Sequence, residues 1–131
     1  MSHQSRVLVV DDDENILSAF KRFFQREQCT MIAASTAAEA LKLCEEESFD
    51  LLIADVRLKL DSGVALFLRI KAAYPKLPVI VITGYPESIT EEDAKRYGAD
   101  YFFLKPLELE KLRAAVRTCL HTFGPARKRA L

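Results

Sequence analysis

Five apolar runs with the character of β-strands recur along the chain. Residues 7–10, 51–54 and 79–82 are continuous aliphatic runs in which no polar residue alternates with an apolar one. Such runs are typical of parallel strands that are covered on both faces of a sheet. We predict strands at residues 6–10, 29–34, 50–54, 78–82 and 100–104.

Between these runs, apolar residues recur at intervals of three and four positions, which is the spacing of one helix face. The four stripes are Ile16, Phe20, Phe23 and Phe24; Ala37, Ala40, Leu41 and Cys44; Val64, Phe67 and Ile70; and Leu109, Leu112, Val116, Leu120 and Phe123.

The predicted helices have start and stop signals at their ends. Asp13 and Glu14 suit a helix start as cap and favourable charge. Capping boxes are formed by Thr36 with Glu39 and by Ser88 with Glu91, and Gly98 lies where a helix would end. Strand and helix therefore alternate five times, which predicts a parallel sheet with right-handed crossovers and helices on both faces.

Polar residues follow four of the predicted strands at their carboxyl ends. Asp11 and Asp12 follow the first strand, Asp55 the third, Thr83 the fourth and Lys105 the fifth. Parallel strands end at one edge of the sheet, and ligands bind there in folds of this class. Clustered carboxylates repel one another and recruit a cation, and Mg²⁺ commonly bridges carboxylates to phosphate. The pattern therefore predicts a site for a divalent cation and a transferred phosphoryl group.

Composition narrows the range of functions. The 131 residues suit one domain, and 19 basic residues balance 19 acidic ones. This balance argues against direct nucleic-acid binding, and the absence of a long apolar segment argues against a membrane span and favours the cytoplasm. The three cysteines match no metal or redox motif, so we expect small buried side chains.

Four sequence blocks, VVDDDENI, DLLIADVRLKLDSG, PVIVITGY and GADYFFLKP, together resemble the receiver domain of bacterial two-component response regulators. The similarity runs from about Arg6 to Phe123. It implies a flavodoxin-like, doubly wound α/β fold with strand order 2-1-3-4-5. It also implies a receiver domain at residues 1–123, followed by a basic tail or linker stub at residues 124–131.

The resemblance assigns a role to each polar residue at the strand ends. It makes Asp55 the phosphoacceptor. Asp11 and Asp12 become the acidic pair that organises Mg²⁺, with Asp12 the more direct ligand, and the backbone carbonyl of Arg57 completes the coordination with Asp55.

The same resemblance makes Thr83 the hydrogen-bond donor to the phosphoryl oxygens and Lys105 their counter-charge. Phe102 takes the position of an aromatic switch, and the Lys105–Pro106 peptide bond is expected to be cis. Thr83 and Phe102 would then remodel the face made by the fourth helix, fifth strand and fifth helix.

The partner implied is a sensor histidine kinase or a histidine phosphotransfer protein, and a homodimer is expected through the remodelled face. The protein would be a switch that catalyses only its own phosphorylation and dephosphorylation. One departure from the family pattern is that Lys59 and Leu60 stand where a proline is usual. Arg57 and Tyr85 are expected to flank the route of attacking water and to tune dephosphorylation.

Three alternatives remain at this stage. A flavodoxin-like domain that binds FMN needs a phosphate-binding loop after the first strand, whereas this chain has DDDEN there. A Mg²⁺-dependent phosphatase with an aspartate nucleophile would leave the Lys-Pro block unexplained. A receiver that only binds partners would not need the full set of acidic, hydroxyl and lysine positions.

Overall fold

The computed structural model describes residues 4–56, 58, 62–85 and 89–123. Arg57, Lys59, Leu60, Ser88 and the tail at 124–131 lie outside the described residues, so the predictions made for them stay untested. The elements in chain order are β1 (Arg6–Val10), α1 (Glu14–Arg26), β2 (Thr30–Ala34), α2 (Ala37–Glu46), β3 (Leu51–Asp55), α3 (Gly63–Ala73), β4 (Val79–Thr83), α4 (Glu91–Arg96), β5 (Tyr101–Leu104), α5 (Leu109–Thr118) and a π-helical turn (Cys119–Phe123).

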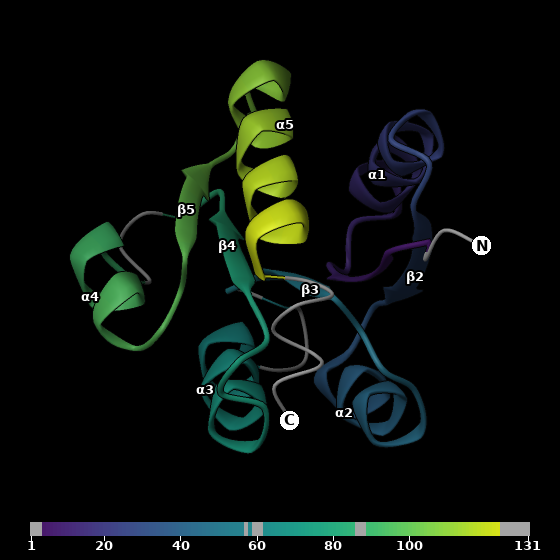
Figure 1. The fold of residues 1–131 in the computed structure, drawn as a ribbon. Coiled ribbons are helices and arrows are strands. Elements are labelled where there is room, and N and C mark those ends of the chain that lie inside the picture. Colours follow the sequence, from purple (N-terminus) through teal and green to yellow (C-terminus); the bar gives the residue numbers. More distant parts are fainter. Residues whose placement is uncertain (1–3, 57, 59–61, 86–88, 124–131) are drawn as a thin grey trace.

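The five strands form one parallel sheet in the order β2-β1-β3-β4-β5 (Figure 1), which confirms the predicted fold. The first strand has the predicted bounds, and the other four each begin one residue later than predicted. Strands β3 and β4 also end one residue later than predicted, so Asp55 and Thr83 are the last residues of these strands rather than the first residues after them.

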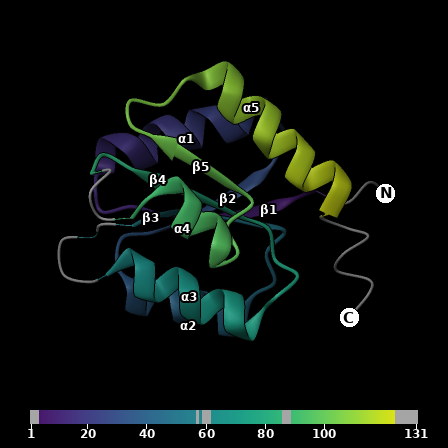
Figure 2. The same cartoon turned by 90° about the vertical axis from the view of Figure 1, so that its left-hand side faces the viewer.

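Helices cover both faces of the sheet. Helices α1 and α5 lie on one face, and α2, α3 and α4 lie on the other (Figure 2). Alternate residues of β1 divide between the two layers: Val7 and Val9 pack with α1 and α5, whereas Leu8 and Val10 pack with the opposite layer. Strands β3 and β4 are buried along their whole length, as their unbroken apolar runs predict.

Side chains cap most helix starts as the sequence predicts. Asp13 accepts a hydrogen bond from the Asn15 backbone at the start of α1, and Thr36 accepts one from Glu39 at the start of α2. Thr90 caps α4 by accepting a hydrogen bond from the Asp93 backbone, and the predicted capping box of Ser88 with Glu91 lies partly outside the described residues.

The structure tests the predictions made for Gly98, Leu109 and the cysteines. Gly98 follows α4 with φ +113°, as expected of a helix-ending glycine. The predicted apolar stripe of α5 is wrong at its first position, because Leu109 is 56% exposed. Cys44 and Cys119 are buried and Cys29 is half-buried.

Within the described ranges, no helix has both the length and the apolar character needed to cross a membrane.

Gly63 fixes the distance between α3 and the carboxyl end of β3. A Cβ atom at this position would lie 1.9 Å from the Asp55 carbonyl oxygen and 2.7 Å from Val56 backbone atoms. The Gly63 amide also donates a hydrogen bond to the Val56 carbonyl at 3.1 Å. Helix α3 can therefore start against the end of β3 only because residue 63 has no side chain.

We predict that Gly63→Ala destabilises the fold by about 1–3 kcal/mol or more, because backbone atoms must move to admit the methyl group. Gly84→Ala is the matched control, since its Cβ would meet only the Lys105 side chain, at 3.8 and 3.9 Å. Urea unfolding of both variants measures the difference. Equal stability of the two variants would contradict the close approach at Gly63.

Candidate phosphoryl and metal site

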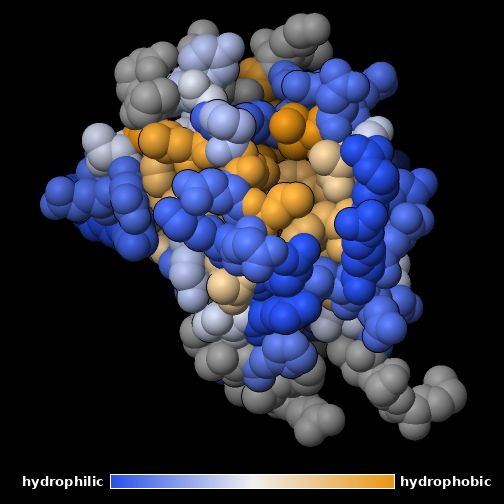
Figure 3. Space-filling view, turned by 90° about the horizontal axis from the view of Figure 1, so that it is seen from above, coloured by the Kyte–Doolittle hydropathy of each residue, from blue (hydrophilic) through white to orange (hydrophobic). Residues whose placement is uncertain are grey.

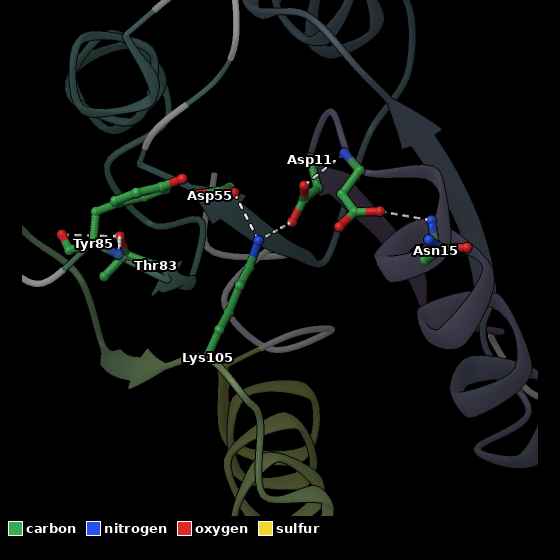
Figure 4. A network of polar contacts seen from close by, with 7 residues as sticks. Asp11, Asn15, Asp55, Thr83, Tyr85 and Lys105 are labelled. Carbon is green, nitrogen blue, oxygen red and sulfur yellow. Dashed lines mark hydrogen bonds and ion pairs between the residues drawn. The ribbon is translucent and has the colours of Figure 1, made fainter.

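The polar residues at the strand ends meet at the carboxyl edge of the sheet. Figure 4 shows Asp11, Asp55, Thr83 and Lys105 arriving there from the ends of β1, β3, β4 and β5. The carboxylates of Asp11, Asp12 and Asp55 each bring an oxygen within 4.8 Å of the others. The structure therefore brings Asp11, Asp12, Asp55 and Lys105 together at the edge that the sequence predicts.

Lys105 connects the two buried carboxylates. Its Nζ donates to Oδ2 of Asp11 and to Oδ2 of Asp55, each at 2.9 Å. Asp11 is 0% exposed and Asp55 4% exposed, so an ammonium group between them offsets negative charge that water cannot reach. The Lys105–Pro106 bond is cis, as predicted.

Burial and these contacts together shift the pKa values of Asp11 and Lys105. Burial raises the pKa of Asp11, although bonds from Lys105 and from the Asp13 amide act in the opposite direction. For Lys105, burial acts to lower the pKa, but hydrogen bonds to Asp55 and Asp11 outweigh it and the net shift is upward. The site thus carries a surplus of negative charge that favours the binding of a further cation.

The three consecutive aspartates after β1 have different tasks. Asp11 accepts a hydrogen bond from the Asp13 amide at 2.9 Å, which orients its carboxylate toward Lys105. The Asp13 side chain faces the other way and caps α1. Asp12 is half-buried and joins Asp11 and Asp55 in the carboxylate cluster.

Thr83 lies at the predicted edge, but its hydroxyl is engaged elsewhere. Its Oγ1 accepts a hydrogen bond from the Tyr85 amide at 2.9 Å and donates one to the Tyr85 carbonyl at 3.2 Å. The Thr83 side chain is fully buried, whereas Tyr85 is 48% exposed and extends toward Asp55 (Figure 4). The hydroxyl must therefore give up its bond to the Tyr85 carbonyl before it can donate to a group bound at Asp55.

Phe102 lies in the middle of β5 and is half-buried against the core layer of α2, α3 and α4. It also lines a hollow of about 340 Å³ together with Phe103, Leu104, Glu91, Glu108 and Lys111. The aromatic ring thus separates the buried core from an open space between α4 and α5. This placement is compatible with the predicted switch role and does not test it.

Two contributors to the site were missed by sequence reasoning. Gly63 sets the position of the Asp55 backbone, and Ser62 caps α3 by accepting a hydrogen bond from Ala65 at 3.2 Å. The Asp-Ser-Gly triplet at residues 61–63 ends one of the sequence blocks quoted above, but only coordinates reveal how closely its glycine approaches β3.

The donor set fits a hard divalent cation. Three carboxylates converge on one point, and the only described cation among them is a lysine that already satisfies one oxygen of Asp11 and one of Asp55. Oxygen ligands of this kind match Mg²⁺, which retains several waters and uses few protein carboxylates. Asp11, Asp12 and Asp55 are the residues that would hold it.

The chain is similar to known proteins over most of its length. A family model for the response regulator receiver domain matches residues 7–117. The response regulator protein PilR of Pseudomonas aeruginosa is 35% identical over 130 residues, which is 99% of this chain and 29% of PilR. The chain therefore spans less than a third of the length of this relative.

The chain is also similar in structure to solved receiver domains and response regulators. A CheY-like receiver domain from Methanospirillum hungatei superposes with a TM-score of 0.83 at 29% identity, covering 92% of this chain and 96% of that one. The response regulator TrrA of Thermotoga maritima, solved in complex with Mg²⁺ and BeF, has a TM-score of 0.81 at 28% identity, covering 89% and 100%.

We predict that Asp11→Asn stabilises the protein by about 1 kcal/mol at neutral pH without divalent cations, because it removes a buried charge. The raised pKa of Asp11 means that the native state binds this proton more tightly than the unfolded state does. The penalty of ionised Asp11 is therefore present at neutral pH and declines as the pH falls through the raised value.

Urea unfolding of wild type and Asp11→Asn, measured from neutral pH down to about pH 4, checks this prediction. The difference in the free energy of unfolding between wild type and Asp11→Asn should shrink as the pH falls. Added Mg²⁺ should stabilise wild type more than the variant. A variant that is less stable at neutral pH would contradict the surplus of negative charge.

Proposed function

The chain belongs to the response regulator receiver domain family, whose members are phosphoacceptor signalling domains, and from this premise we propose how its site works. Asp55 accepts a phosphoryl group from the phosphohistidine of a sensor histidine kinase or a histidine phosphotransfer protein in the cytoplasm. The residues at the strand ends promote this transfer and the later hydrolysis, and no other substrate is turned over.

One observation carries the proposal. Asp55 is almost fully buried, yet its Oδ2 lies 2.9 Å from an ammonium group that also bonds Asp11. A carboxylate held this way is aligned, dehydrated and partly neutralised. Those are the properties that a nucleophile toward a negatively charged phosphorus centre needs.

In the transfer step, an oxygen of Asp55 bonds to phosphorus while the bond from phosphorus to the histidine nitrogen breaks. The electron pair of that bond stays on the imidazole, and the product is an aspartyl phosphate. Lys105 pairs with the phosphoryl oxygens as its contact with Asp55 is replaced. Gly84 leaves room for the incoming group, because it has no side chain beside Lys105.

Mg²⁺, when bound by Asp11, Asp12 and Asp55, supplies charge neutralisation between the carboxylates and the phosphoryl oxygens. Support comes from the convergence of the three carboxylates within 4.8 Å and from the Mg²⁺ present in the Thermotoga relative. The backbone carbonyl of Arg57 is proposed as a further ligand from family resemblance alone.

The phosphoryl group also competes with Tyr85 for the Thr83 hydroxyl. When Thr83 turns toward the phosphoryl oxygens, both of its hydrogen bonds to the Tyr85 backbone break. Tyr85 is released, and Phe102 moves into the space vacated behind β4. The change is a population shift between two packings, biased by a local change in charge. Tyr85, and Arg57 from the sequence alone, are proposed to tune the lifetime of the aspartyl phosphate.

The output surface in this proposal is the face of α4, β5 and α5. Figure 3 looks onto the layer of α1 and α5, of which α5 belongs to this face, and shows apolar residues near its centre, framed by hydrophilic side chains. At the junction of β5 and α5, Leu104 and Leu109 are 50% and 56% exposed. Movement of Phe102 changes the hollow beside them, and a downstream partner or a second activated copy binds there.

The alternatives are less well supported. Asp11 and Asp13 occupy the loop that would have to cradle the phosphate of FMN, and Asp13 already occupies the α1 N-terminus as its cap. A phosphatase needs a second carboxylate free to act as acid and base, whereas Asp11 is fully buried and bonded to Lys105.

We predict that Asp55→Asn reduces Mg²⁺-dependent labelling by acetyl phosphate to background, because the amide is a poor nucleophile. Intact-protein mass spectrometry measures the gain of one phosphoryl group. Glu46→Gln serves as the matched control, since it also removes one carboxylate. Glu46 is an exposed residue of α2, and this variant should label like wild type. Labelling that persists in Asp55→Asn would place the acceptor at another residue.

The coupling from Thr83 to the output face yields a second prediction. With Mg²⁺ and beryllofluoride, amide signals of α4 and β5 should shift in wild type and in Thr83→Ser, which keeps the hydroxyl. In Thr83→Ala the shifts should stay near Asp55. Equal shifts on α4 in Thr83→Ala would show that the signal leaves by another route.

A further inference from the structure

Helix α3 differs from the other long helices because its solvent face is apolar as well as its core face. Leu66, Phe67 and Ile70 are buried, as expected for the core side. The exposed positions are Ala65, Leu68, Arg69, Ala72 and Ala73, of which only Arg69 is charged. A helix that is apolar on all sides is typically covered on all sides.

The second charged residue of α3 is not available to solubilise this face. Lys71 folds back toward the core, where its Nζ donates to the Leu77 carbonyl at 2.7 Å and lies 3.9 Å from an Asp100 oxygen. Leu68 is 38% exposed at the centre of the stripe formed with Ala65 and Ala72. The small alanine side chains allow another helix to approach closely.

Helix α2 lies beside α3 on the same layer, and the two helices are in contact (Figure 1). The Tyr74 hydroxyl at the end of α3 donates to the Cys44 carbonyl of α2 at 3.0 Å. The exposed side of α2 is acidic: Glu39, Glu45 and Glu46 outnumber Lys42. The α2–α3 surface, defined as the exposed residues of these two helices, thus has an apolar stripe with a cation on one helix and carboxylates on the other.

These charges are not satisfied within the part of the chain that the structure describes. Arg69, Glu45 and Glu46 make no side-chain hydrogen bond or ion pair with any described residue. Helix α4 is different, since Lys95 pairs with Glu91 and Arg96 with Asp93. The charges of α4 are neutralised by its own residues, whereas those of the α2–α3 surface remain available to a partner.

We infer that the α2–α3 surface binds a second copy of this chain, with α3 of each copy packed on α2 of the other. A two-fold axis between the helices brings Leu68 and the alanines of one copy against the partner's α2. It also places each Arg69 opposite the carboxylates of the other copy. The surface is therefore complementary to itself, which is what a two-fold interface requires. One leucine and a few alanines support a weak dimer, with a dissociation constant on the order of 10–100 µM.

This contact is distinct from the output face, because it uses neither α4, β5 nor α5. It needs no phosphoryl group, and unphosphorylated protein should form it. A contact on this side leaves the carboxyl edge of the sheet accessible. Dimerisation through α2 and α3 is thus compatible with phosphorylation of Asp55.

Sedimentation equilibrium of the unphosphorylated chain from about 10 µM to 1 mM, without Mg²⁺ or phosphodonor, tests the inference. Wild type should dimerise. Leu68→Lys should weaken association at least tenfold, because it places a charge within the apolar stripe. Leu109→Lys is the matched control, an exposed leucine of the output face that should leave association unchanged. Circular dichroism verifies that both variants fold.

Charge-reversal variants test whether Arg69 of one copy pairs with Glu45 and Glu46 of the other. Arg69→Glu should weaken self-association, and so should Glu45→Lys combined with Glu46→Lys. An equimolar mixture of these two proteins should form heterodimers of at least wild-type affinity, because both of their contacts then join opposite charges. A wild type that stays monomeric at 1 mM, a dimer lost in Leu109→Lys but kept in Leu68→Lys, or a mixture that does not associate would each overturn the inference. Binding of a different protein to this surface, with no self-association, would do so too.

Discussion

The ammonium group of Lys105 joins the carboxyl ends of three strands that are far apart in sequence. Lys105 directly follows β5. Its ammonium group pairs with Asp11, which follows β1, and with Asp55, the last residue of β3. Without this cation, two carboxylates that are nearly inaccessible to water would face each other with no described positive charge between them. The Asp55 carboxylate is buried and still bonded to a cation because the fold supplies Lys105 there.

The same arrangement explains why the site can act as a switch. Lys105 balances only part of the negative charge, which leaves the edge of the sheet able to take up a divalent cation and then a phosphoryl group. Thr83, next to this edge, is held by two hydrogen bonds to the Tyr85 backbone. In the proposed function, a new anion at Asp55 competes for that hydroxyl, and one buried side chain then couples the site to the Tyr85 backbone.

Most of the fold could be predicted from the sequence because its strands are unbroken aliphatic runs and its helices have clear apolar stripes. The position of the site followed from one rule, that parallel strands end at a common edge. Orientation could not be predicted in the same way. Nothing in the order of residues shows that Thr83 turns toward Tyr85, that Leu109 is exposed, or that a Cβ at residue 63 would collide with the Asp55 carbonyl. The first depends on which of several local hydrogen bonds the Thr83 hydroxyl makes, and the other two depend on tertiary packing.

The central claim is that Asp11, Asp12 and Asp55 form one cation site beside the reactive carboxylate. Paramagnetic broadening by Mn²⁺, a stand-in for Mg²⁺ with the same oxygen ligands, tests it most directly, and the chain has no tryptophan for a fluorescence assay. At substoichiometric Mn²⁺, amide signals of residues 11–13, 55–56, 84 and 105 should broaden first, and Mg²⁺ should reverse the effect. Broadening centred on any other part of the molecule would contradict the account.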